Sequence, residues 1–456
     1  MKNSPLPGSR LGRIGHLGRL AGGIAGGMLG EGLRPLTNGQ RPSRQDLLLT
    51  TGNIRRVTDR LAELRGAAMK VGQLLSMEAG DFLPPELTRI LARLRDDAHA
   101  MPLGEVARVL ERAWGKGWER RFRRFDFTPV AAASIGQVHR AETRAGEQLA
   151  VKVQYPGVKA SIDSDVANVA TLLRLFGLLP PGMDIAPLLD EARRQLHEEA
   201  DYRLEARHLT RYRALLAGRE GLVAPRVVEE WTGAEVLPMS YVPGEAVDSF
   251  AGAPQALRDD LATRLLGLAL TELLQWGLVQ TDPNFANYRY DRATDRIGLL
   301  DFGAIRVYPQ AEVEALRRLI AAAVAGDRRA VLAGAHAVGY VAEADPEAYR
   351  DAIAELILTA AEPARQPMAY DFGRADLAQR MTARVMELRV DQGFARLPPP
   401  AILFLHRKIA GTYLLCARLS ARVAVAPLIE RALATPPADS LRGAGSRIPE
   451  SRQANG

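Results

Sequence analysis

The chain has 456 residues, enough for roughly two or three structural units and a sizeable hydrophobic core. Hydrophobic residues make up 47% and charged residues 25%, which excludes fibrous and wholly disordered proteins. The net charge of +7 would suit an anionic membrane surface, nucleic acid or a phosphorylated ligand. Most arginines alternate with acidic residues in helical segments, as on solvated helix faces, and no basic and aromatic alternation indicates a nucleic-acid partner.

Cysteine usage and hydropathy indicate the compartment. The one cysteine, Cys416, lies in an apolar periodic stretch that is typical of a buried thiol in a reducing environment. The first thirty residues interleave arginine with glycine and predict no secretory signal, and charged residues interrupt every long apolar run, which predicts no transmembrane helix. We therefore expect a cytoplasmic protein, with peripheral attachment to the inner membrane face left open.

Composition and periodicity divide the chain into five predicted parts. Residues 1–42 are rich in Gly, Arg and Pro and predict a tail that is either poorly ordered or associated with a membrane, because small residues allow close packing but each glycine costs a helix about 1 kcal/mol. Ala/Leu-rich periodicity over 43–125 predicts a helical extension. Short alternating runs predict an antiparallel sheet with inserted helices over 126–243, followed by a mainly helical part over 244–435, an α+β organisation. Residues 436–456 predict a disordered tail.

Three motifs in a fixed order carry the chemical information. L-A-V-K-V holds Lys152 in a predicted strand, D-P-N-F-A-N runs from Asp282 to Asn287, and L-L-D-F-G holds Asp301. Each motif alone is weak, since a strand lysine usually faces solvent and D-F-G by chance means only a turn. Together they match the protein-kinase signature of a strand lysine, a catalytic-loop Asp and Asn, and D-F-G. The fold predicted is protein-kinase-like with two lobes, a small antiparallel-sheet lobe and a mainly helical lobe.

The residue types suit phosphate chemistry. Mg²⁺ requires oxygen ligands, which Asn287 and Asp301 supply, and Lys152 neutralises the remaining phosphate charge. Asp282 then stands where the proton of a nucleophile must go. The lysine needs a carboxylate partner, and spacing alone does not choose among the candidates in the acidic segment 190–205, which are Glu191, Glu198, Glu199, Asp201 and Glu205.

Further motifs give the chain a specific resemblance. K-V-G-Q spans Lys70 to Gln73, A-A-A-S starts at Ala131, and E-A-D spans Glu199 to Asp201. With these hallmarks, over roughly residues 40 to 310, the chain resembles the UbiB family of atypical protein-kinase-like proteins, which is linked to ubiquinone biosynthesis. The segment Q-T-D-P-N-F-A-N and the Gly-rich N-terminal region resemble the branch that contains the mitochondrial coenzyme Q proteins.

The resemblance implies a role for each matching residue. Lys152 contacts the phosphates of ATP or ADP and pairs with Glu199. Asp282 is the catalytic-loop aspartate, and Asn287 and Asp301 bind Mg²⁺. Four residues line the nucleotide in place of a glycine-rich loop: Ala131, Ala132, Ala133 and Ser134. Because alanine adds a Cβ and restricts positive φ, this loop should alter nucleotide pose, consistent with the family's preference toward ADP.

The resemblance also implies a restricted access to the active site. Lys70 and Gln73 lie on a helix that in the family folds across the active site and contacts the segment ending at Asp201, which suppresses protein phosphorylation. Gln280 and Thr281 precede the catalytic aspartate in place of the His and Arg of ordinary kinases, and no A-P-E follows D-F-G, which argues against a peptide groove.

Two residues after the fifth predicted strand are candidates for contact with adenine. Met239 and Tyr241 flank the base in one interpretation and pack in the core in the other.

The leading hypothesis is therefore a slow ATPase that binds Mg²⁺ and adenine nucleotide and supports ubiquinone biosynthesis at a membrane. Its expected partners are the nucleotide, anionic lipid, and quinone precursors or the enzymes that process them. Two alternatives stay open. One is phosphotransfer to a protein or small molecule, and the other is a pseudoenzyme scaffold that uses nucleotide as a switch.

Overall fold

The computed structural model describes residues 66–68, 70–72, 101–175, 185–282, 284–390 and 400–437. The tail predicted at 1–42, most of the helical extension before residue 101 and nearly all of the tail from 436 lie outside these residues. The chain divides into two compact units. The first holds residues up to Arg207 together with Val227–Tyr241, and the second holds His208–Arg226 together with the residues from Val242.

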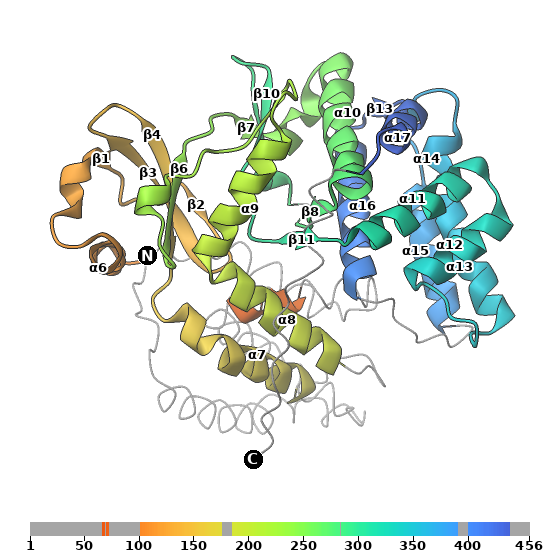
Figure 1. Ribbon diagram of the computed structural model, residues 1–456, viewed down its shortest axis with the longest axis horizontal. Coiled ribbons are helices and arrows are strands. Elements are labelled where there is room, and N and C mark those ends of the chain that lie inside the picture. The colour runs from red at the N-terminus through yellow and green to blue at the C-terminus, as the bar shows by residue number, and fades with distance from the viewer. Residues whose placement is uncertain are drawn as a thin grey trace, which may run out of the picture. The chain divides into compact units, whose positions relative to one another are not determined.

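An antiparallel sheet of five strands forms the centre of the first unit (Figure 1). Its strands are β1 (Phe122–Phe125), β2 (Ala131–Ala132), β3 (Gly136–Thr143), β4 (Gln148–Gln154) and β6 (Val236–Ser240). Their order is β1-β3-β4-β6, and β2 pairs with the first residues of β3, before the part that pairs with β1. The antiparallel sheet expected over 126–243 is therefore present, with β1 starting slightly earlier.

Strand β4 is central because both of its edges are paired and one of its faces is apolar. Leu149, Val151 and Val153 alternate along it, as a half-buried strand requires, and pack in the same core as helix α6 (Leu103–Trp114). Lys152 therefore projects from the opposite face. The neighbouring strand starts at Gly136, where a Cβ would stand 2.4 Å from the carbonyl oxygen of Val153, so only glycine fits the pairing.

Three helices follow β4 in sequence. They are α7 (Val158–Leu175), α8 (Ala186–Glu199) and α9 (Tyr202–Leu215), and α7 packs against α8. Ala200 and Asp201 interrupt the helical run between α8 and α9, and an Asp201 side-chain oxygen accepts the backbone N–H of Arg203 at 3.1 Å. This bond caps the start of α9, so that two short helices replace one long one.

The second unit has short strands beside a long buried helix. Helix α10 (Gln255–Thr271) continues into a π-helical turn at Glu272–Trp276, which ends at Gly277 with a φ of 56°. Strand β8 (Leu278–Gln280) then pairs with β11 (Ile305–Val307). A four-stranded sheet in the order β5-β10-β9-β7 comprises β5 (Leu222–Val223), β10 (Arg296–Leu299), β9 (Tyr288–Asp291) and β7 (Glu245–Ala246).

Helices make up most of the rest of this unit. They are α11 (Gln310–Ala325), α12 (Arg328–Val338), α13 (Glu347–Ala360), α14 (Glu362–Arg365), α15 (Leu377–Val390), α16 (Pro400–Arg418) and α17 (Val425–Ala434). Helix α16 packs against α10, and the Cys416 thiol on it is buried, as predicted. Strand β12 (Tyr370–Asp371) pairs with β13 (Arg422–Val423).

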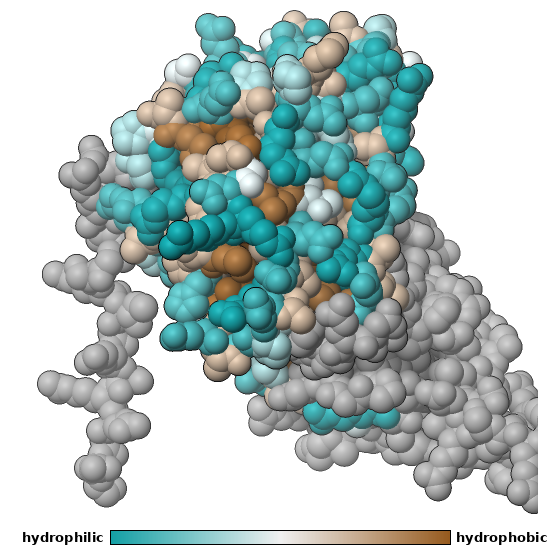
Figure 2. Space-filling model, turned by 90° about the vertical axis from the view of Figure 1, so that its right-hand side faces the viewer, coloured by the Kyte–Doolittle hydropathy of each residue, from teal (hydrophilic) through white to brown (hydrophobic). Residues whose placement is uncertain are grey.

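The surface of these helices is mainly polar. Figure 2 looks onto the side where α12, α13 and α15 lie, and hydrophilic residues cover most of it between separate hydrophobic patches. Within the described ranges, no helix combines the length and the apolarity needed to cross a membrane.

We predict that Gly136→Ala destabilises the first unit, because the added methyl group overlaps the Val153 carbonyl and stands 2.7 Å from the Tyr202 hydroxyl. The expected loss in the free energy of unfolding is about 2 kcal/mol. Gly104→Ala in α6 is the matched control, since its Cβ meets nothing within 4 Å. Chemical denaturation measures both. Equal stabilities for the two variants would contradict the tight pairing of β3 with β4.

Candidate active site

The first unit buries the strand lysine beside a carboxylate. Lys152 lies on β4 opposite Val138 of β3 and Leu237 of β6. Its ammonium donates to Glu205 in the first turn of α9, and the two side chains are 8% and 3% exposed. Burial of a lone ammonium is costly, so the carboxylate offsets that cost and orients the lysine.

This pairing corrects one expectation. The resemblance implied that Lys152 pairs with Glu199, but Glu199 instead accepts hydrogen bonds from the Lys70 ammonium and, at 2.8 Å, from the Ser134 hydroxyl. The physical reason is the break between α8 and α9. It leaves Glu199 as the last residue of α8 and places Glu205 on the next helix, one turn after the Asp201 cap.

The K-V-G-Q segment reaches the E-A-D segment through the Lys70–Glu199 ion pair, which is buried on both sides. This is the contact that the resemblance implies. Gln73 lies outside the described residues. Asp201 caps the N-terminus of α9, the helix that carries Glu205.

The alanine-rich loop is exposed at its start and anchored at its end. Ala131 and Ala132 form the exposed strand β2, and the Ala133 N–H donates to the Gly136 carbonyl at 2.9 Å. The Ser134 hydroxyl is bound to Glu199, so this loop and the K-V-G-Q segment share one carboxylate.

The two adenine candidates differ in their surroundings. Met239 is buried in β6 and pairs with Ala150, which fits the core-packing interpretation. The Tyr241 ring is covered by the Arg140 guanidinium at 4.6 Å from its centroid, a cation–π contact.

The second unit brings the loop residues together. The Asn287 amide nitrogen lies 3.4 Å from an Asp282 carboxylate oxygen, and the Leu300 N–H donates to the Asn287 carbonyl at 3.0 Å. An Asp301 carboxylate oxygen accepts the Gly303 N–H at 3.0 Å, and Gln280 donates to the Asp301 carbonyl at 3.3 Å. Backbone and side-chain bonds therefore hold D-P-N-F-A-N against D-F-G.

A second D-F-G at residues 371–373 shows whether the motif alone identifies a metal-binding aspartate. Asp371 also accepts the N–H of its own glycine, at 3.1 Å, but it sits on β12, where the Arg422 guanidinium lies 3.3 Å from its carboxylate. The bond from the glycine N–H to the aspartate side chain is the same in both places, but only Asp301 lies beside the D-P-N-F-A-N loop.

Sequence reasoning did not identify two cations of α16 that contact the catalytic loop and the residues next to it. On α16, Arg407 donates to an Asp282 oxygen at 2.5 Å. The neighbouring Lys408 ammonium lies 2.5 Å from Glu272 of the π-helical turn, with exposures of 2% and 0%. The available signal was a pair of charges inside an otherwise apolar helix, which must find partners when buried.

Lys408 belongs to a buried polar network. It lies 3.4 Å from both the Gln280 side-chain oxygen and the Tyr288 hydroxyl, while Glu272 also accepts from the Tyr212 hydroxyl. Burial opposes the charge of Lys408, but attraction to Glu272 outweighs it and raises the pKa of the lysine. Burial and the nearby Glu272 carboxylate raise the pKa of Tyr212 well above its usual value, which keeps it a neutral donor.

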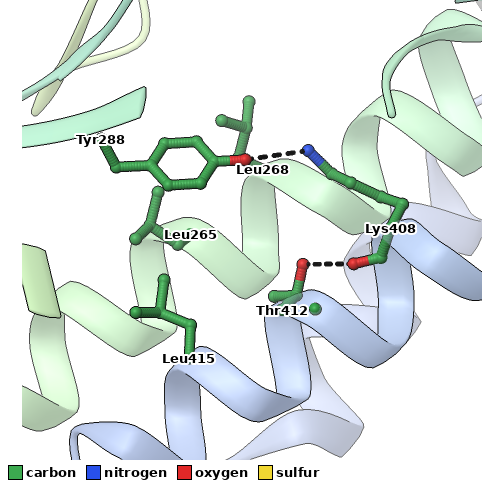
Figure 3. A pocket seen from close by; sticks show the side chains of 7 residues that line it. Leu265, Leu268, Tyr288, Lys408, Thr412 and Leu415 are labelled. Atoms are coloured by element: carbon green, nitrogen blue, oxygen red, sulfur yellow. Dashed lines mark hydrogen bonds between the residues drawn. The ribbon is translucent and has the colours of Figure 1, made fainter. Parts of the chain in front are cut away.

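The cavity beside this network is too small for a ligand. Figure 3 shows Lys408 reaching toward the Tyr288 hydroxyl, with Leu265, Leu268 and Leu415 also lining the cavity and Thr412 bonded to the helix backbone. The free volume is about 10 Å³, room for at most one water molecule. The network is therefore a structural support behind the loop and no substrate pocket.

We predict that Lys408→Met lowers the free energy of unfolding by about 3–5 kcal/mol, because Glu272 is left buried without its cation. Adding Glu272→Gln should recover part of the loss, since the double variant carries no uncompensated charge. Denaturant titration measures both variants. A single variant within about 1 kcal/mol of the wild type would contradict a buried ion pair.

Comparisons with known proteins identify the family. The ABC1 atypical kinase-like domain matches residues 93–335. The mitochondrial atypical kinase COQ8 of Saccharomyces cerevisiae is 35% identical over 437 residues, covering 95% of this chain and 87% of that protein. The mitochondrial atypical kinase COQ8B of Rattus norvegicus is 36% identical over 427 residues, covering 93% of this chain and 80% of that protein.

A solved structure gives the same answer for the fold. The Rv3197–erythromycin complex from Mycobacterium tuberculosis superposes with a TM-score of 0.58 at 27% identity, covering 83% of this chain and 95% of that chain. The predicted α+β protein-kinase-like fold is confirmed, as is the resemblance drawn from the motifs. The chain belongs to the ABC1, or UbiB, family of atypical kinase-like proteins.

Proposed function

We propose that the protein binds Mg²⁺ and adenine nucleotide, hydrolyses ATP slowly, and by this supports ubiquinone biosynthesis at a membrane. The observation that carries the proposal is the intact set of chemical groups. Lys152 is paired with Glu205, and hydrogen bonds of the two loops bring Asp282, Asn287 and Asp301 together.

The donor chemistry fits Mg²⁺. Asp301 offers a carboxylate, and the Asn287 amide nitrogen faces Asp282, which leaves the amide oxygen as its ligand atom. In the proposal Mg²⁺ supplies charge neutralisation to the phosphates, and Lys152 adds a fixed positive charge. Asp282 accepts the proton of the attacking nucleophile.

Several features favour hydrolysis over transfer to a protein. The buried Lys70–Glu199 pair ties the K-V-G-Q segment to the end of α8, and Ser134 of the alanine-rich loop shares the same carboxylate. No A-P-E follows D-F-G, and Gln280 and Thr281 replace the usual His and Arg. Phosphotransfer to a protein or small molecule and a nucleotide-switched scaffold are the alternative functions.

The proposed pathway and cellular location are inferred from the relatives of this chain. Relatives that share about a third of their residues with this chain are mitochondrial COQ8 atypical kinases, and the UbiB resemblance links the family to ubiquinone. We propose a cytoplasmic protein attached peripherally to the inner membrane face, where a net charge of +7 favours anionic lipid. Quinone precursors or their enzymes are the proposed further partners, and nucleic acid is not one.

We predict that Asp301→Asn weakens Mg²⁺-dependent binding of a fluorescent ADP analogue at least tenfold, about 1.4 kcal/mol or more, because a charged metal ligand is lost. Asp371→Asn is the matched control, since it changes the second D-F-G, whose carboxylate is paired with Arg422. Titrations with Mg²⁺ and with EDTA measure both variants. If Asp301→Asn bound Mg–nucleotide like the wild type, the metal assignment would be wrong.

A further inference from the structure

The catalytic-loop aspartate is bound by a residue 125 positions downstream. Arg407 of α16 donates to one Asp282 oxygen at 2.5 Å, and the two side chains are 12% and 21% exposed. A charge-assisted bond of this length, largely shielded from water, restrains a carboxylate much more than the 3.4 Å contact from Asn287.

The next residue fixes the place of Arg407. Lys408 is anchored by Glu272 and also lies 3.4 Å from the Gln280 oxygen and from the Tyr288 hydroxyl. Gln280 stands two residues before Asp282, and Tyr288 follows Asn287 directly. Two consecutive side chains of α16 therefore hold both ends of the loop and the aspartate within it, and Figure 3 shows the Lys408 part of this arrangement.

The loop carries no basic side chain of its own beside the aspartate. Thr281 occupies the position of the arginine in ordinary kinase loops, and its hydroxyl donates to the Ala304 carbonyl at 2.8 Å, away from Asp282. The guanidinium beside the aspartate comes instead from α16, outside the region matched by the family domain, which ends at residue 335.

We propose that Arg407 is a positioning residue for Asp282, and that α16 thereby completes the catalytic loop. Arg407 binds one carboxylate oxygen and so fixes the plane of the carboxylate and the direction of its other oxygen, which the Asn287 amide contacts at 3.4 Å. The inference rests on the proposed function, because Asp282 acts there on the nucleophile's proton. A misplaced base lowers the rate of the chemical step and leaves nucleotide binding unchanged.

The test compares three variants of the full chain. Arg407→Met removes the guanidinium, and Arg407→Lys keeps the charge but loses the planar fork. Arg418→Met is the matched control, since Arg418 is an exposed arginine of the same helix. For Arg407→Met we expect kcat for ATP hydrolysis to fall about 10- to 100-fold with the Kd for an ADP analogue unchanged. Arg407→Lys should lie between, and Arg418→Met should match the wild type.

A double-mutant cycle tests whether Arg407 acts through Asp282. In an Asp282→Asn background, Arg407→Met should cause little further loss of kcat, because the partner carboxylate is already gone. An undiminished further loss would overturn the inference, as would a wild-type kcat in Arg407→Met. If Arg407→Met did not fold, the same cycle would be run with Arg407→Lys. A wild-type kcat in Arg407→Lys, or an undiminished further loss of kcat in the Asp282→Asn background, would then overturn the inference. Absence of hydrolysis by the wild type would instead refute the proposed function.

Discussion

A lysine that enters a protein interior as a cation must meet a carboxylate there, and this constraint organises both units. Desolvation of an unpaired charge costs several kcal/mol, comparable to a large part of the stability of a domain. In the first unit, Lys152 meets Glu205 and Lys70 meets Glu199. In the second, Lys408 meets Glu272. Each pair joins segments that are distant in sequence, so each fixes a tertiary arrangement as well as a local one.

The pairs also connect the chemical groups to their supports. The break at Ala200 and Asp201 gives Glu199 and Glu205 to different helices, so one carboxylate serves the alanine-rich loop and the K-V-G-Q segment while the other serves Lys152. In the second unit, the Lys408–Glu272 pair lies behind the loop that holds Asp282. The support consists of buried polar contacts without a ligand-sized cavity.

Sequence predicted the parts of this architecture that depend on local pattern. Alternation of Leu149, Val151 and Val153 is readable because a half-buried strand has a period of two, and it places Lys152 on the other face. The kinase-like fold was also predictable, because each motif is a short contiguous stretch and the order of the motifs along the chain can be read directly.

Sequence could not predict which charges meet. By spacing, five acids in one segment were equal candidates for the partner of Lys152. The break between α8 and α9, which spacing does not reveal, decides among them. The two D-F-G segments are identical in sequence and share the bond from the glycine N–H to the aspartate side chain, so the motif itself does not tell them apart. Arg407 is separated from Asp282 by 125 positions, and nothing local to either residue indicates the other.

The fate of the γ-phosphate of labelled ATP is the most direct measurement of what this site does. The purified protein would be supplied with Mg²⁺, with and without anionic liposomes, beside Asp301→Asn. The account predicts label released as free phosphate, more of it with liposomes, and none from the variant. Label that accumulated on the protein or on a small molecule would contradict it and identify a phosphotransferase.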